Sequence, residues 1–237
     1  MAIYLTELDN DCWFPAPKEA LADPNGLLAF GGDLSPTRLR FAYQNGIFPW
    51  YGPGEPILWW SPSPRAVFDP KTFKPAKSLQ KFQRKNQYQV SINHATDKVI
   101  DLCASLRPEE ETWINDDMRA AYKQLARLGH CHSVEVWQHG QLIGGLYGVS
   151  VGALFCGESM FSIETNASKI ALWHFCEHFY AHGGQLIDCQ VMNSHLESLG
   201  AQELNRDDFL ESLLSLKKLN IKENCYNSQW LTPNNEE

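Results

Sequence analysis

Three polar side chains, Glu158, Asp188 and Gln190, interrupt segments that are otherwise apolar, LFCGESMF and LIDCQV. Side chains two residues apart in a strand point the same way, which predicts that Asp188 and Gln190 project side by side from a sheet. Such groups can hold an amine and accept its proton while it attacks a carbonyl, so they favour amine acylation. Because buried carboxylates must be paired or hydrogen-bonded, a purely structural network is the alternative.

A cluster of basic side chains lies within residues 71–85, a stretch without acidic residues in a chain whose net charge is -8. Spacings of three and four place most of them on one face of a predicted helix over 76–86. A solvated helix face is one interpretation, and a contact with a phosphate backbone is the other. Trp50 and Trp113 are candidates for stacking on unpaired bases, whereas Trp59 and Trp60 are expected in the core.

Histidines repeat every four residues along a predicted helix, at His174, His178 and His182, a pattern that raises the question of a metal site. No acidic or thiol partner stands at a metal-binding spacing from them, and aromatic residues crowd the segment, so we predict no metal. The seven cysteines include no C-x-x-C pair, and several lie inside apolar segments. We therefore expect reduced and mostly buried thiols.

The elements that must position these side chains change in character near residues 61–68, where we expect a domain boundary. Before it, turns rich in Gly, Pro and Trp surround one short helix, which Ser35 caps. After it, the pattern predicts helices, an antiparallel meander, a helix and a strand. The expected helices cover 76–86, 93–105, 115–128 and 167–182, and the expected strands cover 132–138, 141–152, 153–161 and 185–192.

Composition excludes several classes of protein. With 237 residues, 43% hydrophobic and 20% charged, the chain can bury a core, which excludes intrinsic disorder. Its 20 basic and 28 acidic residues exclude a polycation that coats nucleic acid through bulk charge. No apolar run approaches the roughly 20 residues of a membrane helix, and the N-terminus lacks the pattern of a secretory signal. We therefore expect a soluble, cytoplasmic protein without membrane partners.

A series of motifs in a fixed order connects these features. They are NGLLAFGGDLSP, GIFPW, ILWWSPSPRAV, ETWI, GHCHSVEVW, GGLYGV, LFCGESMFS, NASKIAL, GGQLIDCQV and SLGA. Through them the chain resembles the leucyl/phenylalanyl-tRNA–protein transferase family from about residue 14 to residue 202. The number and order of the matches make this resemblance far more specific than a single short motif.

The resemblance implies an enzyme that makes a peptide bond without a ribosome and without a cofactor. Leucine or phenylalanine, and less readily methionine, would pass from Leu-tRNA or Phe-tRNA to proteins with N-terminal Arg or Lys. The products would be marked for N-degron degradation. The implied fold is α+β, with a small N-terminal α/β domain over 1–64, a GNAT-like acyltransferase domain over 65–232 with a mixed, largely antiparallel sheet, and a disordered tail over 233–237.

By position, Asp188 and Gln190 match the family's proposed catalytic pair, and Glu158 matches a carboxylate of the site. In that mechanism Asp188 polarises Gln190, which draws proton density from the acceptor amine. A neutral amide is a poor base, so we expect Gln190 to orient the amine while a carboxylate, water or the ribose hydroxyl completes proton transfer. The other matches are Leu146, Phe155, Met160, Phe175 and Ile187 for the aminoacyl pocket, Trp50 and Trp113 for the terminal adenosine, and Lys77, Lys81, Arg84 and Lys85 for tRNA.

Two other functions fit the same residues. One is an N-acyltransferase of the same architecture that depends on coenzyme A. Coenzyme A is not expected, because Gln141, Gly144 and Leu146 match the usual phosphate-binding turn only in part. The other is an adaptor that binds tRNA or basic N-termini without chemistry.

Overall fold

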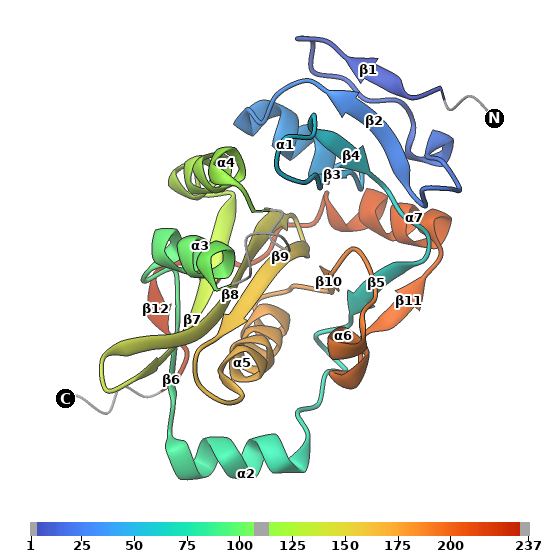
Figure 1. Ribbon diagram of the computed structural model, residues 1–237. Coiled ribbons are helices and arrows are strands. Elements are labelled where there is room, and N and C mark those ends of the chain that lie inside the picture. Colours follow the sequence, from blue (N-terminus) through green and yellow to red (C-terminus); the bar gives the residue numbers. More distant parts are fainter. Residues whose placement is uncertain (1–3, 107–113, 233–237) are drawn as a thin grey trace.

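The structure is a computed structural model that describes residues 4–106 and 114–232. Two sheets organise these residues, a small one in the N-terminal part and a larger one that begins at Arg65 (Figure 1). The tail expected at 233–237 lies outside the described residues. Within the described residues, no helix is long and apolar enough to cross a membrane.

The small sheet has the strand order β1-β2-β4-β3, in which β1 joins β2 in parallel and the other neighbours are antiparallel. Its helix α1 (Pro36–Tyr43) begins as predicted, because the Ser35 hydroxyl accepts the backbone N–H of Arg38. The other elements are β1 (Thr6–Leu8), the short 3-10 helix η1 (Pro17–Glu19), β2 (Leu27–Gly31), β3 (Phe48–Pro49) and β4 (Leu58–Trp60).

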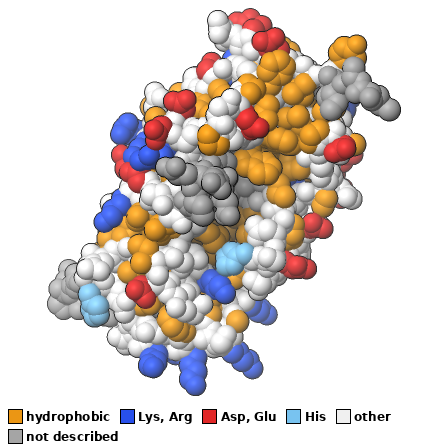
Figure 2. Space-filling view, viewed as in Figure 1, with side chains coloured by type: hydrophobic (Ala, Val, Ile, Leu, Met, Phe, Trp, Pro, Cys, Tyr) orange, Lys and Arg blue, Asp and Glu red, His pale blue; other side chains and the backbone are white. Residues whose placement is uncertain are grey.

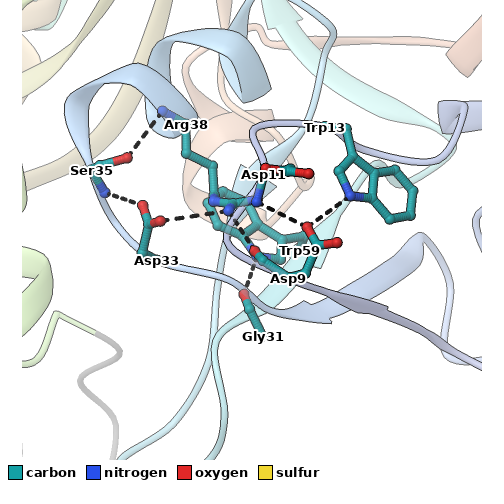
Figure 3. A network of polar contacts seen from close by, with 8 residues as sticks. All are labelled: Asp9, Asp11, Trp13, Gly31, Asp33, Ser35, Arg38 and Trp59. Carbon is teal, nitrogen blue, oxygen red and sulfur yellow. Dashed lines mark hydrogen bonds and ion pairs between the residues drawn. The ribbon is translucent and has the colours of Figure 1, made fainter.

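A buried guanidinium ties these N-terminal elements together (Figure 3). Arg38 on α1 is 1% exposed, and its Nη2 donates to the backbone oxygen of Asp9 at 2.7 Å and to the Asp33 carboxylate at 3.5 Å. Trp59 on β4 is fully buried, as predicted, and donates its indole N–H to the backbone oxygen of Gly31 at 2.9 Å. These bonds hold α1 and β4, which both border the candidate site described below.

The large sheet has the strand order β11-β5-β10-β9-β8-β7-β6-β12. Among these strands β9 and β10 are parallel and the other neighbours are antiparallel, so the expected mixed, largely antiparallel sheet is confirmed. The predicted meander corresponds to β7, β8 and β9. The strands are β5 (Arg65–Phe68), β6 (Gln89–Ile92), β7 (Cys131–Gln138), β8 (Gln141–Val151), β9 (Leu154–Ser162), β10 (Leu186–Asp188), β11 (Gln202–Leu204) and β12 (Gln229–Trp230).

Helices cover both faces of this sheet (Figure 1). Leu146 of β8 packs in the hydrophobic cluster that contains α5, whereas its neighbour Tyr147 packs in the cluster that contains α3 and α4. This alternation is that of a strand buried on both faces. The helices are α2 (Lys77–Asn86), α3 (Thr96–Ser105), α4 (Asp116–Arg127), α5 (Ala167–Ala181), α6 (Ser194–Ser198), α7 (Arg206–Leu216) and the short 3-10 helix η2 (Glu223–Tyr226).

The four helices predicted after the N-terminal part are therefore confirmed, with ends shifted by a few residues. One hydrophobic cluster joins the two sheets, because Tyr43 of α1 and Phe209 of α7 pack together with residues of α3 and α4. The fold is α+β, as predicted, and a small N-terminal sheet precedes the larger mixed sheet along the chain. All seven cysteines are free thiols, and five of them are buried.

Candidate active site

Two cavities meet at one carboxylate of β9. The larger cavity, of ≈ 780 Å³, lies between the small sheet and the chain that follows β10. The smaller cavity, of ≈ 490 Å³, lies between β9, α5 and the same chain. Both cavities are lined by Glu158, Cys189, Gln190 and Asn193. Two of the three polar residues singled out in the sequence therefore lie at the junction.

The smaller cavity is lined by all five residues predicted for an aminoacyl pocket. Four elements contribute them, and four of the five side chains are fully buried while Met160 is half-buried. Buried side chains packed in one core leave little freedom to change shape, so the cavity offers a fixed apolar surface. The five residues are Leu146 of β8, Phe155 and Met160 of β9, Phe175 of α5 and Ile187 of β10.

Glu158 is held by hydroxyl groups that come from both parts of the molecule. The hydroxyl of Tyr122, on α4, donates to Glu158 Oε2 at 2.8 Å, and it is also hydrogen-bonded to the hydroxyl of Tyr43, on α1, at 2.5 Å. Burial raises the pKa of Glu158 from 4.5 to about 7, although the Tyr43 and Tyr122 hydroxyls lower it, and the Asp188 charge also raises it. A carboxylate with this pKa can take up a proton near neutral pH.

Asp188 does not project into the cavities, which corrects the prediction of two side chains side by side. Its carboxylate is 0% exposed and accepts two hydrogen bonds from one guanidinium, that of Arg65 on β5. The Arg65 Nε donates to Oδ1 at 2.8 Å and Nη2 donates to Oδ2 at 2.7 Å. Both oxygens are engaged in this fork, and the carboxylate has no exposed surface from which to contact a substrate.

Gln190 lies beyond the end of its strand. The predicted strand 185–192 stops at Asp188, and Gln190 adopts the left-handed backbone conformation with φ 58°. This turn allows the Gln190 backbone N–H to donate to Asp188 Oδ1 at 2.9 Å, while its side-chain Nε2 points to Glu158 Oε1 at 3.5 Å. Asp188 therefore holds the backbone of Gln190, and Glu158 contacts its amide.

Arg65 is a site residue that sequence reasoning missed, as are Tyr43 and Tyr122. It is 1% exposed, donates Nη1 to the backbone oxygen of Gly46 at 3.0 Å, and packs between the rings of Phe48 and Phe209. A signal was available, because a buried aspartate requires a cation and Arg65 begins the apolar run RAVF. The pair joins the two sheets, since Gly46 precedes β3 in the small sheet.

The predicted adenosine-binding tryptophans are only partly described. Trp50 is 43% exposed and lines the larger cavity, whereas Trp113 lies outside the described residues. Trp60 was expected in the core but is half-buried and lines the same cavity, where its indole N–H donates to the backbone oxygen of Trp50 at 2.6 Å. Figure 2 shows hydrophobic side chains gathered over this part of the molecule.

The predicted basic residues lie on α2, at the opposite end of the molecule from the small sheet (Figure 1). Lys77, Lys81, Arg84 and Lys85 are all exposed, and no ion pair with another described residue neutralises them. Figure 2 shows Lys and Arg side chains projecting from this end. The structure brings the four residues together as a positive helix surface, and none of them lines either cavity.

An apolar cavity with a few polar groups at one edge is the usual form of a substrate site, so the geometry indicates an enzyme. The model of the family described as leucyl/phenylalanyl-tRNA protein transferase matches residues 67–214, and the model of that family's N-terminal domain matches residues 32–63. The chain therefore belongs to the leucyl/phenylalanyl-tRNA–protein transferase family and is an enzyme.

Curated relatives with that name are similar along almost their whole length. The relative from Vibrio atlanticus (strain LGP32) is 70% identical over 98% of this chain and 98% of its own. The relative from Vibrio vulnificus (strain CMCP6) is 70% identical over 99% of this chain and 100% of its own. The relative from Aliivibrio salmonicida (strain LFI1238) is 61% identical over 98% of this chain and 99% of its own.

Proposed function

We propose that the protein transfers leucine or phenylalanine, and methionine less readily, from aminoacyl-tRNA to proteins that begin with Arg or Lys. The observation that carries this proposal is the position of Glu158, whose pKa is raised by burial to about 7, at the mouth of an apolar cavity. The acceptor amine attacks the ester carbonyl, a C–N bond forms, and the bond to the ribose oxygen breaks. Glu158 accepts the amine proton and returns it to the departing ribose hydroxyl.

Gln190 is proposed to orient the acceptor. Its amide lies at the junction of both cavities and contacts Glu158, which supports a role in holding the amine between the base and the ester. Asp188 and Arg65 are proposed to act indirectly, because they fix the backbone turn that presents Gln190. In this assignment Asp188 does not polarise the side-chain amide of Gln190. Its carboxylate contacts the backbone N–H of Gln190 and not the side chain.

The larger cavity is proposed to receive the terminal adenosine of tRNA and the first residue of the acceptor. Trp50 and Trp60 offer aromatic surfaces for a base, and the carboxylates of Glu55 and Glu158 at the same cavity favour a cationic Arg or Lys side chain. Trp113 stays a predicted adenosine contact. The proposed reaction takes place in the cytoplasm and marks its products for N-degron degradation.

The aminoacyl pocket can be tested by filling it. Met160→Phe adds an aromatic ring to a cavity of ≈ 490 Å³ whose other predicted walls are rigid. We expect kcat/KM for Phe-tRNA to fall at least tenfold more than kcat/KM for Leu-tRNA. This is on the order of the discrimination between two substrates that contacts in an apolar pocket supply. Competition assays with both charged tRNAs measure this ratio. Leu214→Phe, at an exposed position of α7, is the matched control, and an equal loss with both donors would contradict the pocket assignment.

The basic surface of α2 is proposed to contact tRNA. We expect Lys81→Glu combined with Arg84→Glu to weaken tRNA binding at least tenfold and to lower the slope of log affinity against log salt by about 2, one for each phosphate contact. Filter binding at several salt concentrations measures both. Lys18→Glu with Lys218→Glu makes the same change of charge at exposed positions elsewhere and should leave the slope unchanged. If the α2 variant binds tRNA with unaltered affinity, this surface is only a solvated helix face and does not contact tRNA.

One assay separates the proposal from its two alternatives. Charged Leu-tRNA is incubated with a labelled peptide that begins with Arg, and the expected product is the peptide extended by leucine. A coenzyme A-dependent enzyme would instead need acetyl-CoA; however, the candidate turn at 141–146 lies within the extended strand β8, where backbone N–H groups pair with neighbouring strands. Tight tRNA binding without any product would favour the adaptor.

A further inference from the structure

We propose a second site, a zinc-binding cluster formed by His178, His182 and Cys225, at the end of α5 that is remote from the cavities' polar junction. One ring nitrogen of each histidine and the Cys225 sulfur all lie within 4.8 Å of one another. Histidine nitrogen and cysteine sulfur are the ligands that zinc prefers. The cluster was hidden in the sequence, because Cys225 follows His182 by 43 positions and is brought to it by η2.

A backbone carbonyl oxygen accepts a hydrogen bond from one nitrogen of each imidazole ring. His178 Nε2 contacts the backbone oxygen of Cys225 at 2.7 Å, and His182 Nδ1 contacts the backbone oxygen of His178 at 2.7 Å. Because a carbonyl oxygen only accepts, these nitrogens donate, and the second nitrogen of each neutral ring keeps its lone pair for a metal. Metal-binding histidines commonly carry such a bond to a carbonyl on their other nitrogen.

The segment that carries Cys225 is also tied to α5 by its backbone. The N–H of Lys222 donates to the oxygen of His182 at 2.9 Å, and the N–H of Cys225 donates to the oxygen of Lys222 at 3.0 Å. The two histidines come from the end of α5, where the macrodipole favours a cation. Ligands of a tetrahedral zinc ion lie about 3.5 Å apart, so closure requires shifts of about 1 Å, mainly in the half-buried histidines.

The proposed ion would link the C-terminal segment, through η2, to α5 beside residues that line the aminoacyl pocket. Tyr226, next to Cys225, stacks on His132 with ring centroids 3.7 Å apart and lies near Phe155 and Phe179. Coordination converts the Cys225 thiol to a thiolate and releases its proton to solvent, with solvent water completing the coordination. Zinc bound to the folded state would therefore stabilise the C-terminal segment.

Cobalt(II) is the probe for this site, added to the full-length chain free of any affinity tag. We expect one equivalent to produce a thiolate-to-cobalt charge-transfer band, which one equivalent of zinc abolishes. The Cys225→Ser variant should lack the band. His182→Gln, at a half-buried position that tolerates change, should weaken cobalt binding at least tenfold. Cys12→Ser removes the exposed thiol of the chain and is the matched control, in which the band should persist.

A thermal melt gives the second readout. One equivalent of zinc should raise the melting temperature of the wild-type chain and of Cys12→Ser but not that of His182→Gln. The proposal is overturned if the wild-type chain shows no charge-transfer band at one equivalent, or if the band disappears with Cys12→Ser. Should Cys225→Ser not fold, His182→Gln decides the outcome by itself, because unchanged cobalt affinity in this variant excludes the cluster.

Discussion

Replacement of Glu158 by glutamine is expected to slow peptide-bond formation by about 10²–10⁴-fold, the usual contribution of a general base. Glutamine keeps the shape of the side chain and can accept the hydrogen bond from the Tyr122 hydroxyl, but it cannot take up a proton. Donor tRNA binding should change little, because the basic surface of α2 and Trp50 are untouched. Single-turnover assays with Leu-tRNA and an Arg-initiated peptide measure the chemical step.

The pH dependence of this step identifies the proton acceptor. Because the pKa of Glu158 is raised to about 7, the wild-type base is protonated below this pH and the rate should fall as pH decreases. The acceptor α-amine, with a pKa of roughly 7.7–8.0, contributes its own fall in both enzymes. The wild-type profile should therefore be steeper below pH 7 than the Glu158→Gln profile. If the two profiles have identical slopes and the two rates agree within threefold, the proton acceptor is water or the ribose hydroxyl and not Glu158.

Stability provides an independent check on the raised pKa. The folded protein holds a proton on Glu158 up to about pH 7, whereas the unfolded chain loses it near pH 4.5. The free energy of unfolding that this protonation contributes is complete below pH 4.5 and is lost as pH rises through 7. Relative to Glu158→Gln, the loss amounts to about 3 kcal/mol. Urea denaturation of both proteins at several pH values measures the difference. Glu164→Gln makes the same substitution at an exposed position near the end of β9 and is the matched control.

Replacement of Arg65 by methionine is expected to lower the free energy of unfolding by about 3–5 kcal/mol, because it leaves the Asp188 carboxylate buried without its partner. Activity should fall as well, since Asp188 would no longer be fixed as the acceptor for the Gln190 backbone. Urea denaturation and transfer assays on the same preparation measure both. Arg119→Met removes partly exposed ion pairs with Asp101 and Asp116 and should cost no more than about 1 kcal/mol.

A double variant separates the structural role of this pair from its role in the reaction. Arg65→Met with Asp188→Leu replaces both charges by apolar groups, and we expect it to recover at least half of the lost stability. Activity should not recover, because the Gln190 backbone N–H still lacks the acceptor that holds its left-handed turn. Recovery of activity together with stability would mean that the pair only supports the fold and does not position Gln190.

The sequence alone predicted much of the fold and part of the site. Periodicity and capping residues gave the helices and the meander correctly, because these signals act between neighbours in the chain. The helix capped by Ser35 and the basic face of α2 are examples. The motif series led to the family, and all five residues expected in the aminoacyl pocket line one cavity. The resemblance to the family supplied these five residues, which lie on three strands and one helix.

Only the tertiary structure decided which polar groups meet. Alternation in 185–192 predicted that Asp188 and Gln190 share one face. In the structure the buried guanidinium of Arg65, on β5, pairs with Asp188, and the strand ends before Gln190. Tyr43 and Tyr122 reach Glu158 from separate elements, and burial of Glu158 in the folded chain raises its pKa although the two hydroxyls lower it. Likewise, Cys225 meets His178 and His182 only because η2 folds back on α5. Local patterns determine elements, whereas desolvation and charge pairing depend on contacts between residues far apart in the chain.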